Sequence, residues 1–289
     1  MGFQIIKEKV YANIPSFLKK YAKSFFYDIV LFSKYSLKYR ILYKKWDFFD
    51  SIALETTTHC NLRCKFCPNN KYARGSKKNE KLMSEKLFKK IIDELAEVRY
   101  KGQILFHFYG EPLTDKRLPE LVDYTNKKLP YANMQLNTNG FLLSIPIYNE
   151  LVSKGIKVFF ITQYSNSMPP KIKELFSYLE SHLDVENKIL YRVLGEDLPL
   201  SNRGGEIPVE KNIDFDRPIC LHPRNAVNVD FNGNVLLCCN DYHSSIKFGN
   251  LEKEKIIDIW EKPIYKNFRR QLKKKQFVLP ICKKCVGLN

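Results

Sequence analysis

Short apolar runs alternate with longer helical ones along the middle of this 289-residue chain, and this alternation restricts the fold more than any other feature. Apolar residues at every second position predict strands, and apolar residues at helical spacing predict helices. Such an order favours an α/β fold with a parallel sheet, open or closed into a barrel, whose functional residues collect at the carboxyl ends of the strands. The expected strands are 51–56, 103–109, 133–137, 156–161 and 188–193, and the expected helices are 84–99, 116–128, 145–153 and 170–182.

The alternation stops after Arg203-Gly204-Gly205, and the remaining chain is rich in loops. Apolar runs at 227–229 and 234–237 flank Asn232-Gly233, a dipeptide that favours a type I′ hairpin turn. A helix over 256–274 is expected to follow. We therefore expect three parts, namely an N-terminal extension over 1–50, an α/β region over 51–205, and a small α+β domain over 206–289.

The N-terminal extension carries a helix signal with a basic character. Asn13 is a candidate cap, Pro15 suits a first turn, and apolar residues follow at helical spacing. A basic amphipathic helix can lie on an anionic membrane or pack its apolar stripe on its own domain. No secretory signal and no apolar run of about 18 residues is found, so we expect a cytoplasmic protein, with peripheral contact at the inner membrane face through residues 1–50 as an option.

The net charge of +17 is spread along the chain. Residues 1–50 contribute +6, residues 51–205 contribute +6, and residues 206–289 contribute +5. An even excess argues against a dedicated nucleic-acid surface and is compatible with an anionic substrate. The basic run from Arg269 to Lys275 is interpreted as the solvated face of a helix.

Eight cysteines in a reducing compartment indicate metal or redox sites. Cys60, Cys64 and Cys67 form a C-x3-C-x2-C loop directly after the first expected strand. Three thiolates from one tight loop suit three corners of a cubane iron–sulfur cluster and leave the fourth iron open for a substrate or cofactor. The alternative is a zinc site with His59 as fourth ligand, which the adjacency of His59 and Cys60 disfavours.

This loop resembles the C-x3-C-x-Φ-C signature of the radical S-adenosylmethionine (SAM) superfamily, in which Φ is aromatic. The resemblance covers roughly residues 51–205, and Tyr109 replaces the first glycine of the family's GGEP motif. It implies a partial (βα)6 TIM-like barrel and a [4Fe–4S] cluster that binds SAM. The implied site residues are Cys60, Cys64 and Cys67 on the cluster, Phe66 against the adenine, the backbone of Gly110, Glu111 and Pro112 on the SAM amino group, and Asn137 and Asn139 near the ribose.

A second cysteine group consists of Cys220, Cys238, Cys282 and Cys285. The first two lie at the ends of the expected hairpin, and the last two form a terminal C-x2-C. Four thiolates can close a metal site around zinc or a fully ligated [4Fe–4S] cluster. The arrangement resembles the SPASM and Twitch domains of radical SAM enzymes, and mainly the shorter Twitch form, which implies one auxiliary [4Fe–4S] cluster.

Cys239 and Arg203 are the candidate catalytic residues. Cys239 is predicted to point away from the side of its strand that Cys238 occupies, as either an inert buried thiol or a hydrogen-atom donor. Arg203 follows the last expected strand, and the resemblance to Twitch enzymes that oxidise an aminocyclitol implies that it binds substrate or takes the hydroxyl proton. A purely structural arginine is the alternative.

Weaker candidates line the expected strand ends. His107 shares a strand face with Tyr109 and either lines the substrate site or is a core histidine. Gln163 and Tyr164 follow the strand at 156–161, where substrate contacts or ordinary loop polarity are both compatible.

The leading hypothesis is a radical SAM oxidoreductase that forms a 5′-deoxyadenosyl radical, abstracts a hydrogen atom, and passes a second electron to the auxiliary cluster. The expected substrate is a sugar, a cyclitol or an activated anionic polyol. The expected partner is a reducing protein such as flavodoxin or ferredoxin, with no specific nucleic acid. Alternatives are an epimerase that uses Cys239, a peptide-modifying maturase and, from another class, an Fe–S or zinc nucleic-acid-binding protein.

Overall fold

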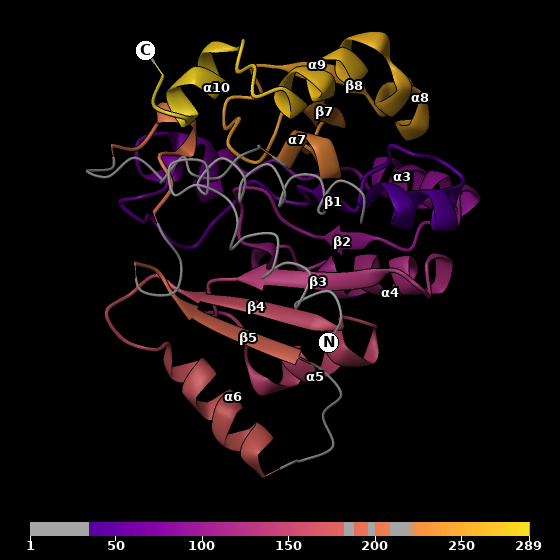
Figure 1. Ribbon diagram of the computed structural model, residues 1–289. Coiled ribbons are helices and arrows are strands. Elements are labelled where there is room, and N and C mark those ends of the chain that lie inside the picture. The colour runs from indigo at the N-terminus through magenta and orange to yellow at the C-terminus, as the bar shows by residue number, and fades with distance from the viewer. Residues whose placement is uncertain (1–34, 182–187, 196–199, 209–219, 221, 289) are drawn as a thin grey trace, which may run out of the picture.

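The computed structural model describes residues 35–181, 188–195, 200–208, 220 and 222–288, which form one mixed sheet flanked by helices (Figure 1). Five parallel strands lie in the order β5-β4-β3-β2-β1, and each overlaps a strand that the alternation predicted. These strands are β1 (Ser51–Leu54), β2 (Gln103–Leu105), β3 (Asn133–Thr138), β4 (Val158–Gln163) and β5 (Lys188–Val193).

The helices between these strands also lie where the spacing predicted them. They are α3 (Glu85–Glu97), α4 (Leu118–Lys128), α5 (Ile145–Ser153) and α6 (Pro170–Glu180). The Ser84 hydroxyl accepts a hydrogen bond from the Leu87 amide at 3.2 Å and so caps α3. The alternation of strands and helices confirms the α/β class. Within the described residues the sheet has free edges at β5 and β8, so it does not close into a barrel.

The C-terminal strands continue the same sheet. β6 (Ala226–Val229) pairs parallel with β1, and β7 (Asn234–Leu236) and β8 (Lys247–Asn250) follow antiparallel. Four short helices complete this part, namely α7 (His222–Asn225), α8 (Ile256–Glu261), α9 (Pro263–Lys273) and α10 (Pro280–Cys285). In Figure 1, α8, α9 and α10 lie beyond β1, at the opposite end of the molecule from α6. Direct pairing of β6 with β1 places the second cysteine group next to the first strand of the α/β region.

Two local predictions in this region were wrong. The turn between β6 and β7 is a four-residue loop in which Gly233, at φ +79°, but not Asn232 has a positive φ, so it is not type I′. The Asp230 carboxylate accepts hydrogen bonds from the Asn232 and Asn234 amides, which stabilises the longer loop. The expected helix over 256–274 is broken at Lys262, because Pro263 offers no amide hydrogen and restricts the residue before it.

The basic run from Arg269 is also not uniformly solvated, because Arg269 is only 3% exposed. Its guanidinium lies 3.7 Å from the centroid of the Trp260 ring and pairs with Asp47 at 3.0 Å. The arginine therefore joins α9 to the segment that leads into β1. Its neighbours Lys273, Lys274 and Lys275 are exposed, as predicted.

Little of the N-terminal extension belongs to the described residues. Residues 35–43 form a helix, in which Tyr39 is buried against Phe48. The amphipathic helix predicted from Asn13 onward, and its membrane contact, lie outside the described residues. None of the helices in the described part of the chain has the length and hydropathy to cross a bilayer.

Candidate active site

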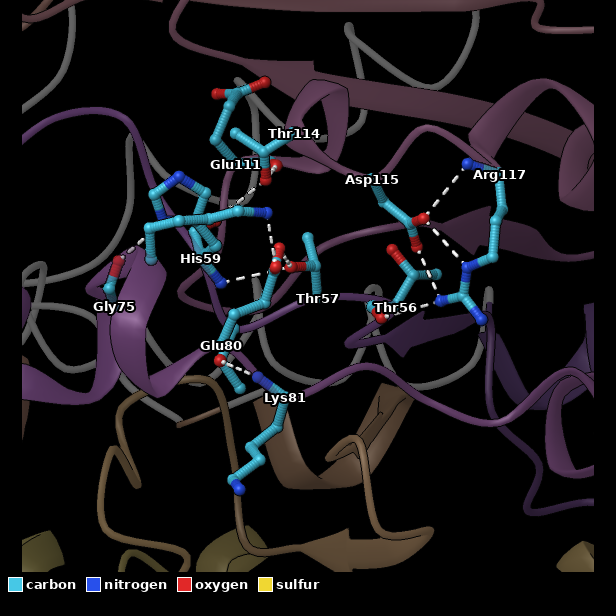
Figure 2. Close-up of polar contacts among 12 residues, drawn as sticks. Thr56, Thr57, His59, Gly75, Glu80, Lys81, Glu111, Thr114, Asp115 and Arg117 are labelled. Carbon is cyan, nitrogen blue, oxygen red and sulfur yellow. Dashed lines mark hydrogen bonds and ion pairs between the residues drawn. The ribbon is translucent and has the colours of Figure 1, made fainter.

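The loop with the first three cysteines leaves the carboxyl end of β1 and is held by hydrogen bonds through His59 (Figure 2). The His59 carbonyl accepts from the Glu111 amide at 2.7 Å and from the Thr114 hydroxyl at 3.2 Å. The His59 Nδ1 donates to the Gly75 carbonyl at 3.0 Å, and the same carbonyl accepts from the Cys60 amide. His59 thus anchors the loop to the end of β2.

Cys60, Cys64 and Cys67 are partly buried in this loop. Burial raises the pKa of all three thiols, to about 11 for Cys64, so free thiolates are disfavoured in the absence of bound metal. Among the described residues, no group of three His, Cys, Asp or Glu side chains is arranged to hold a single metal ion. Three thiols on one short loop can each bind a separate iron of one cluster.

The Gly110-Glu111-Pro112 segment is packed tightly against this loop. A Cβ atom at Gly110 would lie 2.0 Å from the Thr57 carbonyl oxygen, so only glycine fits. The buried Glu111 carboxylate accepts from the Thr138 hydroxyl at 2.7 Å and from the Asn139 amide at 2.9 Å. Burial raises the pKa of Glu111 to about 7. Glu111 therefore joins the end of β2 to the end of β3, a side-chain role that the motif alone did not indicate.

The other residues predicted to bind SAM lie around the same strand ends. The Asn139 side-chain Nδ2 donates to the Asn61 Oδ1 at 2.8 Å, which links the end of β3 to the cysteine loop. Asn137 is only partly buried and contacts the His107 Nε2 at 3.3 Å. The Phe66 ring lies 5.4 Å from the Tyr164 ring, between centroids, so the candidate adenine and substrate residues are adjacent.

The second cysteine group gathers around α10. Burial raises the pKa of the Cys282 thiol to about 12, and the nearby Cys220 and Cys285 thiols also act to raise it. Burial and neighbouring thiols, among them Cys220 and Cys282, raise the pKa of Cys238. Its sulfur accepts a hydrogen bond from the Asn240 backbone amide at 3.4 Å. Four thiols as a donor set suit a closed iron–sulfur cluster or a zinc ion.

Arg203 begins the short turn Arg203–Gly205, which packs on α10. Its φ is +49°, a strained conformation for a non-glycine residue. The strain is held by Asn202, whose side chain accepts from the Gly204 amide at 3.2 Å and donates to the Lys284 carbonyl of α10 at 2.9 Å. The Arg203 charge acts to lower the pKa of Cys67 in the first group and of Cys239 beside the second. The guanidinium is thus within electrostatic reach of both groups.

Cys239 differs from the other seven thiols. Its sulfur lies 3.7 Å from the His222 Nδ1. Burial acts to raise the pKa of Cys239, but the His222 ring and Arg203 outweigh burial and lower it. Cys239 therefore faces a cationic environment on the Arg203 side.

Sequence reasoning missed a buried connection between the two regions. The Asn69 amide nitrogen donates to the Tyr109 carbonyl, and its oxygen accepts from the Tyr242 hydroxyl, both at 2.9 Å. Arg74 pairs with Glu55 at 2.6 Å and donates to the Tyr242 carbonyl. Asn69 and Arg74 were hidden because a polar residue in a loop carries no local signal of burial.

Comparisons with known proteins agree with this geometry. Residues 54–167 match the radical SAM superfamily model, and residues 220–286 match the iron–sulfur cluster-binding SPASM domain. The chain is similar to the S-adenosyl-L-methionine-dependent 2-deoxy-scyllo-inosamine dehydrogenase of Niallia circulans, with 33% identity over 83% of this chain and 94% of that protein.

Solved structures give the same result. The structure of BtrN in complex with AdoMet and 2-DOIA aligns with a TM-score of 0.73 and 32% identity over 82% of this chain and 93% of that one. BtrN in an open conformation aligns with a TM-score of 0.63 and 28% identity over 82% and 92% of the two chains. The chain therefore belongs to the radical SAM superfamily and combines its SAM- and [4Fe–4S]-binding domain with a SPASM-type auxiliary-cluster domain.

Proposed function

We propose that this radical SAM enzyme is a dehydrogenase that oxidises a secondary hydroxyl group of a cyclitol or aminocyclitol to a ketone. The similarity to the inosamine dehydrogenase over 94% of its length supports the substrate class. The observation that carries the proposal is the place of Arg203, in a turn anchored to α10 beside the second cysteine group and with its charge within reach of Cys67. A two-electron oxidation requires one electron acceptor besides the radical source, and the second group supplies a site for it.

The residues divide into those for SAM and those for substrate. When bound, SAM and the two clusters supply hydrogen-atom abstraction and acceptance of one electron. Cys60, Cys64 and Cys67 hold the first cluster, and Cys220, Cys238, Cys282 and Cys285 hold the second. Phe66, the Gly110-Glu111-Pro112 backbone, Asn137 and Asn139 hold SAM at the strand ends.

Arg203 orients the substrate hydroxyl and stabilises negative charge on its oxygen. A guanidinium stays charged over the whole working pH range, so it favours an alkoxide electrostatically rather than acting as an ordinary base. Its backbone is fixed to α10 through Asn202, so its position follows that of the second cluster. The buried strand ends keep water away from the reacting carbon.

Anaerobic reconstitution tests the proposal. With reductant, SAM and 2-deoxy-scyllo-inosamine, the enzyme is expected to release equal amounts of 5′-deoxyadenosine and ketone. Arg203→Gln is expected to release 5′-deoxyadenosine with little ketone, and Arg203→Lys is expected to restore part of the coupling. Ketone formation at the wild-type ratio by Arg203→Gln would remove the assigned role of Arg203, and a wild-type enzyme that forms no ketone would refute the substrate class.

The place of Cys239 favours a second candidate function, epimerisation, because its thiol lies beside His222 and within the field of Arg203. An epimerase returns a hydrogen atom to the substrate radical from a thiol. Product formed in deuterated water would then carry one deuterium at the reacting carbon, and Cys239→Ser would abolish this incorporation. A ketone without incorporation decides for the dehydrogenase.

The electron supply is proposed to be a small reducing protein such as flavodoxin or ferredoxin. The net charge of +17 supports a partner with an acidic surface. A binding measurement with reduced flavodoxin over increasing salt concentration tests this, since electrostatic association weakens with ionic strength.

A further inference from the structure

Two side chains just beyond β2, His107 and Tyr109, each have a buried polar atom without a hydrogen-bond partner among the described residues. They alternate with Phe106, which packs on Phe88 of α3 and so faces the helices. Because neighbouring residues of an extended chain point to opposite sides, His107 faces the other side of the sheet. The contact of His107 with Asn137 of β3 confirms this direction. Neither side chain has an assigned role in SAM binding or cluster ligation.

The Asn137 side chain bonds the Gln135 side chain at 2.6 Å and the His107 Nε2 at 3.3 Å. Burial, with the Arg203 charge, lowers the pKa of His107 to about 4, so the ring is neutral. The other ring nitrogen, Nδ1, is buried and has no hydrogen-bond partner among the described residues.

The Tyr109 hydroxyl is also buried without a hydrogen-bond partner among the described residues. The residue as a whole is 8% exposed. The ring is fixed edge-on against Phe108 and Tyr242, with centroids 4.8 Å away in each case. Charges at Arg203, Cys239, Cys67 and Cys238 all act on this hydroxyl. The Tyr109 carbonyl is also held by Asn69, two residues after Cys67, and its ring packs on Tyr242, three residues after Cys239. Tyr109 therefore lies between the segments that carry the two cysteine groups.

Buried polar groups normally find a partner, because leaving one unpaired costs about 1–3 kcal/mol. Two unpaired polar groups at one strand end, next to the first cysteine loop, would be paired by a bound ligand. We propose that the His107 Nδ1 and the Tyr109 hydroxyl form hydrogen bonds with hydroxyl groups of the substrate. Together with Arg203 they orient a polyhydroxylated ring, and they select for substrates with oxygens beside the reacting carbon. This inference rests on the proposed function.

Tyr109→Phe is the sharpest test, because it removes one oxygen and keeps the ring contacts. Tyr148→Phe is the matched control, since the Tyr148 hydroxyl is also buried without a described partner but lies on α5, beside Phe159. With the reconstituted enzyme and 2-deoxy-scyllo-inosamine, Tyr109→Phe is expected to raise KM roughly tenfold and Tyr148→Phe to leave it unchanged. His107→Phe is expected to raise KM as well. An unchanged KM for Tyr109→Phe with normal ketone formation overturns the inference and leaves the proposed function intact.

A second measurement does not require the substrate to be known. Without substrate, removing an unpaired hydroxyl is expected not to lower the Tm of the holoenzyme, so Tyr109→Phe and Tyr148→Phe match or exceed the wild type. Tyr242→Phe removes a paired hydroxyl and is expected to lower Tm. A Tm loss in Tyr109→Phe as large as that in Tyr242→Phe means a structural partner and overturns the inference. If the wild type forms 5′-deoxyadenosine but no ketone, the proposed function fails, and this Tm comparison alone decides the inference.

Discussion

The two cysteine groups, which we propose as the ligands of the two clusters, are assembled in opposite ways. Cys60, Cys64 and Cys67 lie within eight residues on one loop, which His59 fastens to the end of β2. The second group comes from three segments between residues 220 and 285, which meet only because β6 pairs with β1 and α10 packs on Arg203–Gly205. The first site is thus local and open, and the second depends on the tertiary fold and is closed. A site assembled from distant segments couples metal binding to folding more strongly than a single loop does.

Cys64→Ala is expected to have the largest effect on activity. Loss of one of three ligands removes the SAM-binding cluster, so 5′-deoxyadenosine formation falls to background and the iron content falls from about eight to about four per chain. Iron analysis and product analysis after anaerobic reconstitution measure both. Retained SAM cleavage in Cys64→Ala would contradict the assignment of the open site to this loop.

Cys282→Ala is expected to separate the two sites. The iron content again falls to about four per chain, but SAM cleavage continues while ketone formation is lost, because the electron acceptor is missing. Cys239→Ala is the matched control, since Cys239 adjoins a ligand without being one, and it keeps about eight irons. Zinc in the wild-type second site, or normal ketone formation by Cys282→Ala, would contradict an auxiliary cluster that accepts the electron.

Arg74→Met tests the junction between the regions. Its partner Glu55 is fully buried, with Asp230 nearby, and has a pKa raised to about 7 by burial. Removing the guanidinium leaves this carboxyl uncompensated, so the free energy of unfolding is expected to fall by about 3–5 kcal/mol. Lys89→Met, which breaks an exposed pair with Glu85, is the control and changes stability by less than about 0.5 kcal/mol. Equal effects in denaturant unfolding would mean that the junction does not depend on this ion pair.

The stability of the first region is expected to depend on pH through the buried carboxyl group of Glu111. Burial raises its pKa in the folded protein to about 7 from an ordinary value of 4.5, so the folded state binds the proton more tightly than the unfolded state. This contribution to stability is complete below pH 4.5 and is lost as pH rises to about 7, by at most about 3 kcal/mol. Relative to the wild type, Glu111→Gln is therefore expected to gain stability between pH 5.5 and 7.5. A difference that does not change with pH would show that Glu111 is ionised throughout.

The contrast between the regions also explains what the sequence could predict. The strands, the helices α3 to α6 and the first cysteine loop follow from periodicity and short spacing, which are local properties. The turn at Asp230 and the break at Pro263 depended on a single side chain each, within an otherwise correct region. Burial of Arg269 and the contact of Asn69 with Tyr242 join residues more than 170 positions apart, so no local pattern could indicate them.

Tyr242→Phe is expected to lower stability less than Arg74→Met does, and it addresses a second contact between the regions. The Tyr242 hydroxyl donates to the buried Asn69 Oδ1, and the Asn69 side-chain nitrogen donates to the Tyr109 carbonyl at the edge of the first site. Losing the hydroxyl leaves the Asn69 oxygen without this donor, so the free energy of unfolding is expected to fall by about 1–2 kcal/mol. Tyr72→Phe is the control, because its hydroxyl bonds Glu206 at the exposed surface and its loss changes stability little. If the two variants unfold at the same denaturant concentration, the Asn69–Tyr242 contact does not help to hold the regions together.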